Sequence, residues 1–146
     1  AKTSFAKIPL FGWFYKKGSV LVDRKSDLSR RRSFEEMKEV LSGGIHMCIY
    51  PEGTRNRTNE PLKKFYDGAF KLAIAANTDI IPAVILNTKK ALPVNKSFYF
   101  LPHKLEMHFL EPIEVAKYTT SEELKDKTFA VMTAYYQSKE NTKEKI

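Results

Sequence analysis

The sequence predicts an α/β fold in one domain, with a mixed β-sheet flanked by helices. Two apolar runs indicate buried strands, Ile45–Tyr50 and Ile80–Leu86, because neither contains a charge and turn-forming residues bound each one. A strand that is apolar on both faces is typical of a parallel strand in an α/β sheet. Helical spacing of apolar residues in Leu28–Leu41 and Asp67–Ala76 makes helices and strands alternate along the chain.

The beginning of the chain is expected to form a helix and then a strand. Pro9 suits the first turn of a helix that ends near Lys17. The segment Phe5–Lys17 mixes aromatic residues with lysines, which suits either a helix lying on anionic lipid or a helix whose rings pack on the core. Gly18–Asp23 is predicted as a strand, and Arg24 follows its carboxyl end, where α/β sheets bind ligands.

The helix over Leu28–Leu41 is expected to begin near Ser26, or later at a capping box formed by Ser33 and Glu36. Two glycines then end it. The three arginines at residues 30–32 suit a solvated helix surface or a contact with phospholipid, and both alternatives remain open.

Five more elements are predicted beyond the polar loop Glu52–Thr58. They are a helix over Asp67–Ala76 capped by Asn77, a strand over Ile80–Leu86, strands over Phe98–Leu101 and Leu105–Leu110, and a helix from a Thr120–Glu123 capping box to Gln137. Pro82 places its strand at an edge, an end or a bulge, because proline has no N–H to donate. The polar residues 138–146 are expected to fray.

The formal net charge of +8 is concentrated in the first half of the chain. Residues 1–64 contain 14 lysines and arginines against 7 acidic residues, whereas residues 65–146 contain 11 against 10. This asymmetry favours a phosphorylated substrate, an acidic lipid surface or a nucleic acid. No nucleic-acid-binding motif accompanies the charge, so no nucleic-acid partner is expected. A single cysteine, Cys48, excludes an intrachain disulfide, and no apolar run is long enough to span a bilayer.

The residues most suited to ligand binding follow the first apolar run. Gly53 permits close approach of the backbone, Thr54 offers a hydroxyl, and Arg55 offers a planar fork that fits a phosphate. A polar turn with solvated arginines has the same pattern, so spacing alone leaves both interpretations open.

Four blocks in this order resemble the glycerolipid acyltransferases, the family of lysophosphatidic acid (1-acylglycerol-3-phosphate) acyltransferase. Tyr50-Pro51-Glu52-Gly53-Thr54-Arg55 is similar to the family's Phe-Pro-Glu-Gly-Thr-Arg block, and Gly18–Arg24, Lys64–Ala73 and Ile80–Val84 resemble the blocks around it. The resemblance implies a glycerol-3-phosphate acyltransferase-like fold. It also implies an enzyme of phospholipid biosynthesis that moves a fatty acyl group from acyl-CoA or acyl carrier protein to the free hydroxyl of lysophosphatidate.

The resemblance implies roles for individual residues as well. Arg24 and the loop Glu52-Gly53-Thr54-Arg55 would bind the phosphate and glycerol of the acceptor. Glu52, as an anion, would orient the arginines or a hydroxyl instead of holding the phosphate. Pro82 would shape the side that takes the acyl donor. The implied partners are a lysophospholipid, an acyl thioester and an anionic membrane surface on the cytoplasmic side, with no metal or prosthetic group.

The family's catalytic pair, His-x-x-x-x-Asp, does not occur in these residues. In that pair the histidine is the general base for the acceptor hydroxyl, and the aspartate orients it. We therefore expect residues 1–146 to be the C-terminal part of one acyltransferase domain, inactive alone, with residues 1–17 as an interfacial segment. His46 and Cys48 are a poor substitute, because residues i and i+2 of a strand lie about 7 Å apart.

Two alternatives to this function remain open. One is a non-catalytic domain that binds lipids or anions. The other is an acyltransferase whose acceptor is a different lyso-lipid or glycerol-3-phosphate.

Overall fold

The computed structural model describes residues 6, 8–23, 26–93 and 102–143, with side chains up to residue 140. The chain forms two compact units, residues 1–48 and residues 49–146. The strand predicted at Phe98–Leu101 lies outside the described residues.

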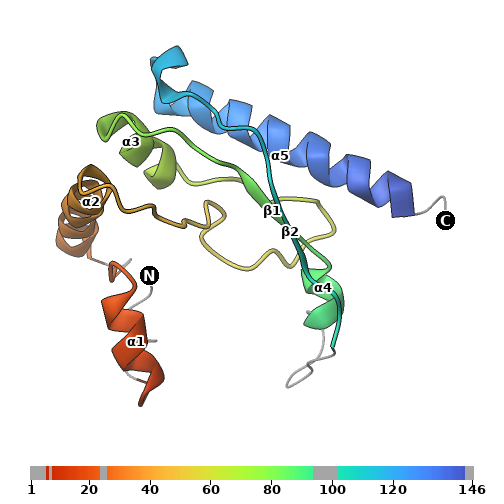
Figure 1. Cartoon of the computed structure of the whole chain (residues 1–146), viewed down its shortest axis with the longest axis horizontal. Helices are drawn as coiled ribbons and strands as arrows, with labels where there is room; N and C mark the ends of the chain where they lie inside the picture. The colour runs from red at the N-terminus through yellow and green to blue at the C-terminus, as the bar shows by residue number, and fades with distance from the viewer. Residues whose placement is uncertain (1–5, 7, 24–25, 94–101, 144–146) are drawn as a thin grey trace. The chain divides into compact units, whose positions relative to one another are not determined.

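The first unit contains two helices, α1 (Phe11–Lys17) and α2 (Asp27–Ser42), which Figure 1 shows at the red and brown end of the chain. α2 begins at the earlier of the two predicted starts, because the Ser26 hydroxyl accepts a hydrogen bond from the Ser29 N–H at 3.2 Å. Ser33 is buried inside the helix and does not cap it. The helix ends where Gly44 adopts a φ of +78°, a conformation that glycine tolerates.

The two strands predicted in the first half of the chain are wrong for the described residues. Within Gly18–Asp23, Val22 forms only an isolated bridge, although Val20 is buried. Ile45–Tyr50 has no regular secondary structure, and Ile45 and Tyr50 are 63% and 71% exposed. An apolar run becomes a buried strand only where other strands pair with its backbone and side chains cover both faces, and no described strand pairs with this one.

The second unit is built from α3 (Gly68–Ala75), β1 (Ala83–Leu86), α4 (Thr88–Ala91), β2 (Glu106–Phe109), the 3₁₀ helix η2 (Val115–Lys117) and α5 (Ser121–Lys143). β1 and β2 form an antiparallel sheet that pairs Ala83 with Phe109 and Leu86 with Glu106. Figure 1 shows α5 running along this sheet, and α5 contacts both β1 and α3. β1 starts after Pro82, as its missing N–H predicts, and the Pro82 carbonyl accepts a hydrogen bond from the Leu110 N–H at 2.9 Å.

The two faces of this sheet have different surroundings. Val84 and Leu86 are buried in a core with Phe70 and Leu124, which come from the helices. On the other face Met107 and Phe109 are 50% and 68% exposed. The strand alternation therefore fixes which side chains meet α5.

The predicted capping box of the last helix is confirmed. Thr120 Oγ1 accepts a hydrogen bond from the Glu123 N–H at 3.2 Å, and Glu123 Oε2 accepts one from the Thr120 N–H at 3.3 Å. The helix then continues to Lys143, beyond the predicted end at Gln137. Charged side chains do not end a helix, and no glycine or proline follows Gln137 in the sequence.

Candidate functional site

The candidate site is the loop that runs from Tyr50 to Tyr66. Its ends are closed by a backbone hydrogen bond from the Tyr66 N–H to the Pro51 carbonyl at 2.9 Å. At its first turn Gly53 adopts a φ of +63° and donates its N–H to the Tyr50 carbonyl at 3.0 Å. Glycine adopts this conformation without strain, which agrees with the expectation that Gly53 permits a close approach of the backbone to a ligand.

The Glu52 side chain bridges the two arms of the loop. Its Oε2 accepts a hydrogen bond from the Lys63 N–H at 3.0 Å, in a half-buried position. Satisfying this backbone N–H helps to hold the loop in shape. The expectation that Glu52 orients an arginine or a hydroxyl stays a prediction.

Asn56 organises the far end of the loop, a role that the sequence analysis did not assign. Its Oδ1 accepts hydrogen bonds from the Thr58 N–H at 2.9 Å and the Thr58 hydroxyl at 2.7 Å, and its Nδ2 donates to the Glu60 carbonyl at 2.9 Å. An asparagine that binds the backbone two residues further on is an Asx turn. The Asn-x-Thr spacing in the sequence was the available signal for it.

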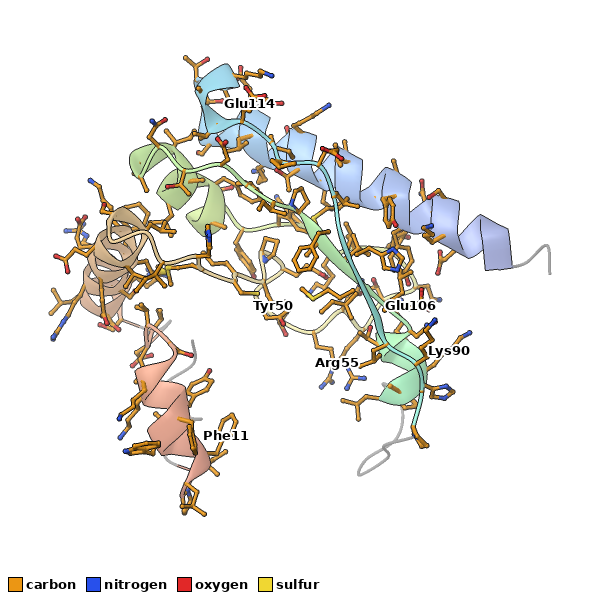
Figure 2. The ribbon with its side chains drawn as sticks, viewed as in Figure 1. Phe11, Tyr50, Arg55, Lys90, Glu106 and Glu114 are labelled. Carbon is orange, nitrogen blue, oxygen red and sulfur yellow. The ribbon has the colours of Figure 1, made fainter. Side chains whose placement is uncertain are left out.

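Two basic side chains tie this loop to the segment around α4. The Arg55 guanidinium donates a hydrogen bond to the Leu92 carbonyl, and Figure 2 shows Arg55 at the α4 end of the sheet. Lys89 Nζ donates to the Thr58 carbonyl at 2.9 Å. These contacts join residues that lie 37 and 31 positions apart in the sequence, so they attach the loop to the segment around α4.

The charges of this region are compatible with the predicted anion site. In the described part of the chain, none of Arg55, Arg57, Lys89 and Lys90 forms an ion pair with a carboxylate. Arg55 and Lys89 donate to neutral carbonyls, whose hydrogen bonds are weaker than those to a phosphate oxygen. Thr54, which precedes Arg55 in the sequence, is exposed. A phosphate arriving here would therefore meet a fork, a hydroxyl and uncompensated positive charge.

The described residues do not test the predicted roles of Arg24 and Pro82. Arg24 lies outside the described residues, so its convergence with Arg55 stays a prediction. Pro82 is buried at the start of β1, and its role on the acyl-donor side also stays a prediction.

The sequence analysis did not predict a polar cluster that lies between β2 and α5. His108 lies with Nδ1 2.6 Å from the Tyr135 hydroxyl and Nε2 3.2 Å from Glu106 Oε2. His108 is half-buried. Apolar and polar residues alternate over Leu105–Phe109, which places Glu106 and His108 on one face of the strand. This alternation was the signal from which their contact with the last helix could have been predicted.

One ion pair fixes the start of α3 to α5. Lys125 Nζ lies 2.8 Å from Asp67 Oδ1. The hydrogen bond and charge of Lys125 lower the pKa of Asp67 below its ordinary value, and the hydrogen bond to Asp67 raises the pKa of Lys125.

Among the described residues, no helix combines the length and the apolar character that crossing a membrane requires.

Comparison with known proteins gives consistent similarities. A family model described as Acyltransferase matches residues 1–86. The chain is similar to the 1-acyl-sn-glycerol-3-phosphate acyltransferase of Haemophilus influenzae, with 31% identity over 81% of this chain and 48% of that protein. It is similar to the Escherichia coli K12 protein of the same name, with 34% identity over 80% of this chain and 47% of that protein.

A solved structure has the same fold. It is the 1-acyl-sn-glycerophosphate (LPA) acyltransferase PlsC from Thermotoga maritima, with a TM-score of 0.82 and 23% identity over 96% of this chain and 55% of that chain. This likeness confirms the predicted fold class. The chain spans 48% of the Haemophilus protein and 31% of the similar Chlamydomonas reinhardtii protein, so it covers at most about half of these curated relatives.

Proposed function

Since this chain belongs to the acyltransferase family, we propose that the protein containing it moves a fatty acyl group from a thioester to the free hydroxyl of lysophosphatidate. In this reaction the hydroxyl oxygen attacks the thioester carbonyl carbon, the carbon–sulfur bond breaks, and the hydroxyl proton leaves to a general base. The product is phosphatidate, so the enzyme acts in phospholipid biosynthesis. The names of the relatives support this acceptor.

The observation that carries the proposal is the position of Arg55. Arg55 follows Thr54 on a loop closed by Glu52 and shaped by Gly53, and the described partner of its guanidinium is the neutral Leu92 carbonyl. A phosphate monoester binds a guanidinium more strongly than a carbonyl does, so it can take Arg55 from Leu92. We assign Thr54 and Arg55 to the acceptor phosphate, with Arg24 as a further ligand.

Residues 1–146 are proposed to supply binding and not the general base. No histidine in the sequence is followed five residues later by an aspartate. The chain alone should therefore release no thiol from acyl-CoA in a way that depends on lysophosphatidate. Acceptor-dependent release above background would mean that the base lies within these residues, whereas anion binding without turnover by the full-length protein would favour the non-catalytic alternative.

The remaining parts of the proposal concern the surroundings of the reaction. The donor is acyl-CoA or acyl carrier protein, with Pro82 on the donor side, and no metal or prosthetic group takes part. We place the protein on the cytoplasmic side of a membrane, with residues 1–17 at the anionic surface. The exposed aromatic side chains of α1 and its lysines Lys16 and Lys17 support this placement.

The experiment compares Arg55→Ala with Lys127→Ala in the full-length protein. Lys127 is an exposed cation of α5. Arg55→Ala should lower kcat/KM for lysophosphatidate roughly tenfold to a hundredfold, the scale of a lost charge-assisted hydrogen bond of about 1.5–3 kcal/mol. The donor KM and the unfolding midpoint should change little, because Arg55 is exposed. Equal kinetics for the two variants would remove Arg55 from the acceptor site.

A further inference from the structure

The loop that carries Thr54 and Arg55 is attached to α4 at two points. The Arg55 guanidinium donates a hydrogen bond to the carbonyl of Leu92, the residue that follows the last one of the helix. Further along the loop, the Thr58 carbonyl accepts a hydrogen bond from Lys89 Nζ at 2.9 Å. Lys89 lies in the first half of α4, so the loop is bound to both the beginning and the end of this short helix.

α4 offers the loop a firm place of attachment. It follows β1 after one residue, Asn87, whose Nδ2 donates a hydrogen bond to the Lys104 carbonyl at 2.9 Å. Leu86, which precedes Asn87, and Ala91, within the helix, are both buried. Packed and hydrogen-bonded backbone moves less than an exposed loop does. The half-buried Lys89 side chain therefore extends toward the loop from a part of the chain that is fixed to the core.

Thr58 passes this attachment on to its neighbours in the loop. Asn56 Oδ1 accepts hydrogen bonds from the Thr58 N–H at 2.9 Å and from the Thr58 hydroxyl at 2.7 Å, and the Glu60 N–H donates to the same hydroxyl at 3.3 Å. Together with the bond from Lys89, these contacts engage every polar group of Thr58, although the residue is exposed. Lys89 thus holds a point of the loop that is itself bound on both sides.

An acceptor phosphate would affect the two attachments differently. In the proposed function the phosphate takes Arg55 from the Leu92 carbonyl, and Leu92 is exposed, so its carbonyl can bind water instead at little cost. The bond from Lys89 to Thr58 does not involve Arg55 and can persist when the phosphate is bound. Within the described part of the chain, it is then the hydrogen bond that still joins the loop to α4.

We infer that Lys89 is a positioning residue for the acceptor, because it keeps the loop on α4 when Arg55 leaves Leu92 to bind the phosphate. This inference rests on the proposed acyl transfer to lysophosphatidate. Lys89 acts through Thr58 and does not touch the phosphate. A loop that stays attached loses less conformational entropy when it binds a ligand, so the attachment lowers the KM for the acceptor.

The first test uses Lys89→Met in the full-length protein, which removes the ammonium group and keeps an apolar stem. The KM for lysophosphatidate should rise about threefold to tenfold, the scale of one exposed hydrogen bond from a charged group. The KM for the acyl donor and the unfolding midpoint should change little. Lys89→Arg can still donate to the Thr58 carbonyl and should stay close to the wild type. Lys127→Met, which removes an exposed cation of α5, should match the wild type.

Hydrogen exchange of the protein without ligand separates positioning from a direct contact with the phosphate. The amides of residues 52–66 should exchange at least about threefold faster in Lys89→Met than in the wild type, because loss of the attachment favours local opening. Lys90→Met removes the neighbouring, exposed charge and should leave this exchange unchanged. A raised KM without faster exchange would assign Lys89 to the phosphate itself, and equal increases in KM for Lys89→Met and Lys90→Met would assign the effect to charge alone. Either result, or an unchanged KM, overturns the inference.

The inference can also be separated from the proposed function. If the full-length wild type transfers no acyl group to lysophosphatidate, the proposed function fails. The exchange measurement still decides whether Lys89 holds the loop, because it needs no substrate. Faster exchange of residues 52–66 that is confined to Lys89→Met supports the attachment, whereas equal exchange in all variants rejects it.

Discussion

The Glu52 carboxylate accepts the Lys63 N–H at 3.0 Å and so joins two points of one loop that are 11 residues apart. Thr54 and Arg55 lie between them in the sequence. A binding loop held by a hydrogen bond of its own loses less conformational entropy when a ligand orders it. We therefore propose that Glu52 favours binding of the acceptor through the shape of the loop.

Replacing Glu52 by alanine should test this role. Glu52→Ala leaves the Lys63 N–H without its acceptor, which should lower the free energy of unfolding by about 1 kcal/mol for a half-buried hydrogen bond. It should also raise the KM for lysophosphatidate in the full-length protein. Glu52→Gln keeps a side-chain oxygen as acceptor, so its free energy of unfolding and its KM for lysophosphatidate should both stay close to those of the wild type. If the glutamine variant is as impaired as the alanine variant, the negative charge itself is needed and the structural role is wrong.

The ion pair between Asp67 and Lys125 predicts a pH dependence of stability. Lys125 lowers the pKa of Asp67 below 3.8, so the stabilising charge is fully present above that value and is lost as the pH falls through the folded-state pKa. Asp67 raises the pKa of Lys125 above 10.5. The stabilisation that comes from the charged lysine is therefore lost as the pH rises through this raised pKa. Between these limits the pair stabilises the joint between α3 and α5.

Urea unfolding of wild type, Asp67→Asn and the exposed control Glu111→Gln should be compared from pH 2 to pH 11. Asp67→Asn should be less stable than wild type at pH 7, and the difference should disappear at the acid end. The control should follow the wild type throughout. A difference that persists at pH 2 would show that Asp67 acts through something other than its charge.

The elements that could be predicted from the sequence are those fixed by neighbouring residues. The Thr120–Glu123 capping box, the cap at Ser26 and the break at Pro82 all depend on side chains within a few positions of the backbone they bind. Local rules of this kind need no knowledge of the rest of the fold.

What could not be predicted depends on distant residues. The apolar run Ile45–Tyr50 predicted a buried strand, but its residues are mostly exposed. Burial depends on which strands pair with the run, and the sequence did not say which strands those would be. The bonds from Arg55 to Leu92 and from Lys89 to Thr58 cross 37 and 31 residues, and no local pattern encodes them. The loop residues of the site were therefore identifiable, whereas their attachment to α4 was not.

The contact between His108 and Tyr135 predicts a local effect on stability. The two groups are 2.6 Å apart and half-buried, so Tyr135→Phe should leave a His108 ring nitrogen unpaired between β2 and α5. We expect a loss of roughly 0.5–1.5 kcal/mol in the free energy of unfolding, measured by urea denaturation. Tyr66→Phe removes the hydroxyl of an exposed tyrosine and should change stability little. Similar values for the two variants would mean that the His108 contact contributes nothing.

The last prediction concerns α1 and the membrane. Trp13 and Phe14 are exposed on this helix, and Lys17 Nζ lies 4.2 Å from the centre of the Trp13 ring. Aromatic rings beside lysines bind a lipid interface through both apolar contact and charge. The full-length protein should therefore bind vesicles that contain anionic lipid more strongly than neutral vesicles. Salt should weaken the preference, because charges are screened beyond about 10 Å at 0.1 M.

A matched pair of substitutions locates the effect. Phe14 and Phe109 are both 68% exposed, but only Phe14 belongs to α1. Phe14→Ala should reduce vesicle binding severalfold, since full burial of a phenylalanine side chain contributes about 1.5–3 kcal/mol and an interface buries part of it. Phe109→Ala should bind as the wild type does in a sedimentation assay. If both variants bind equally, or if the same amount of protein sediments with neutral and with anionic vesicles, the aromatic rings of α1 pack within the protein instead of binding lipid.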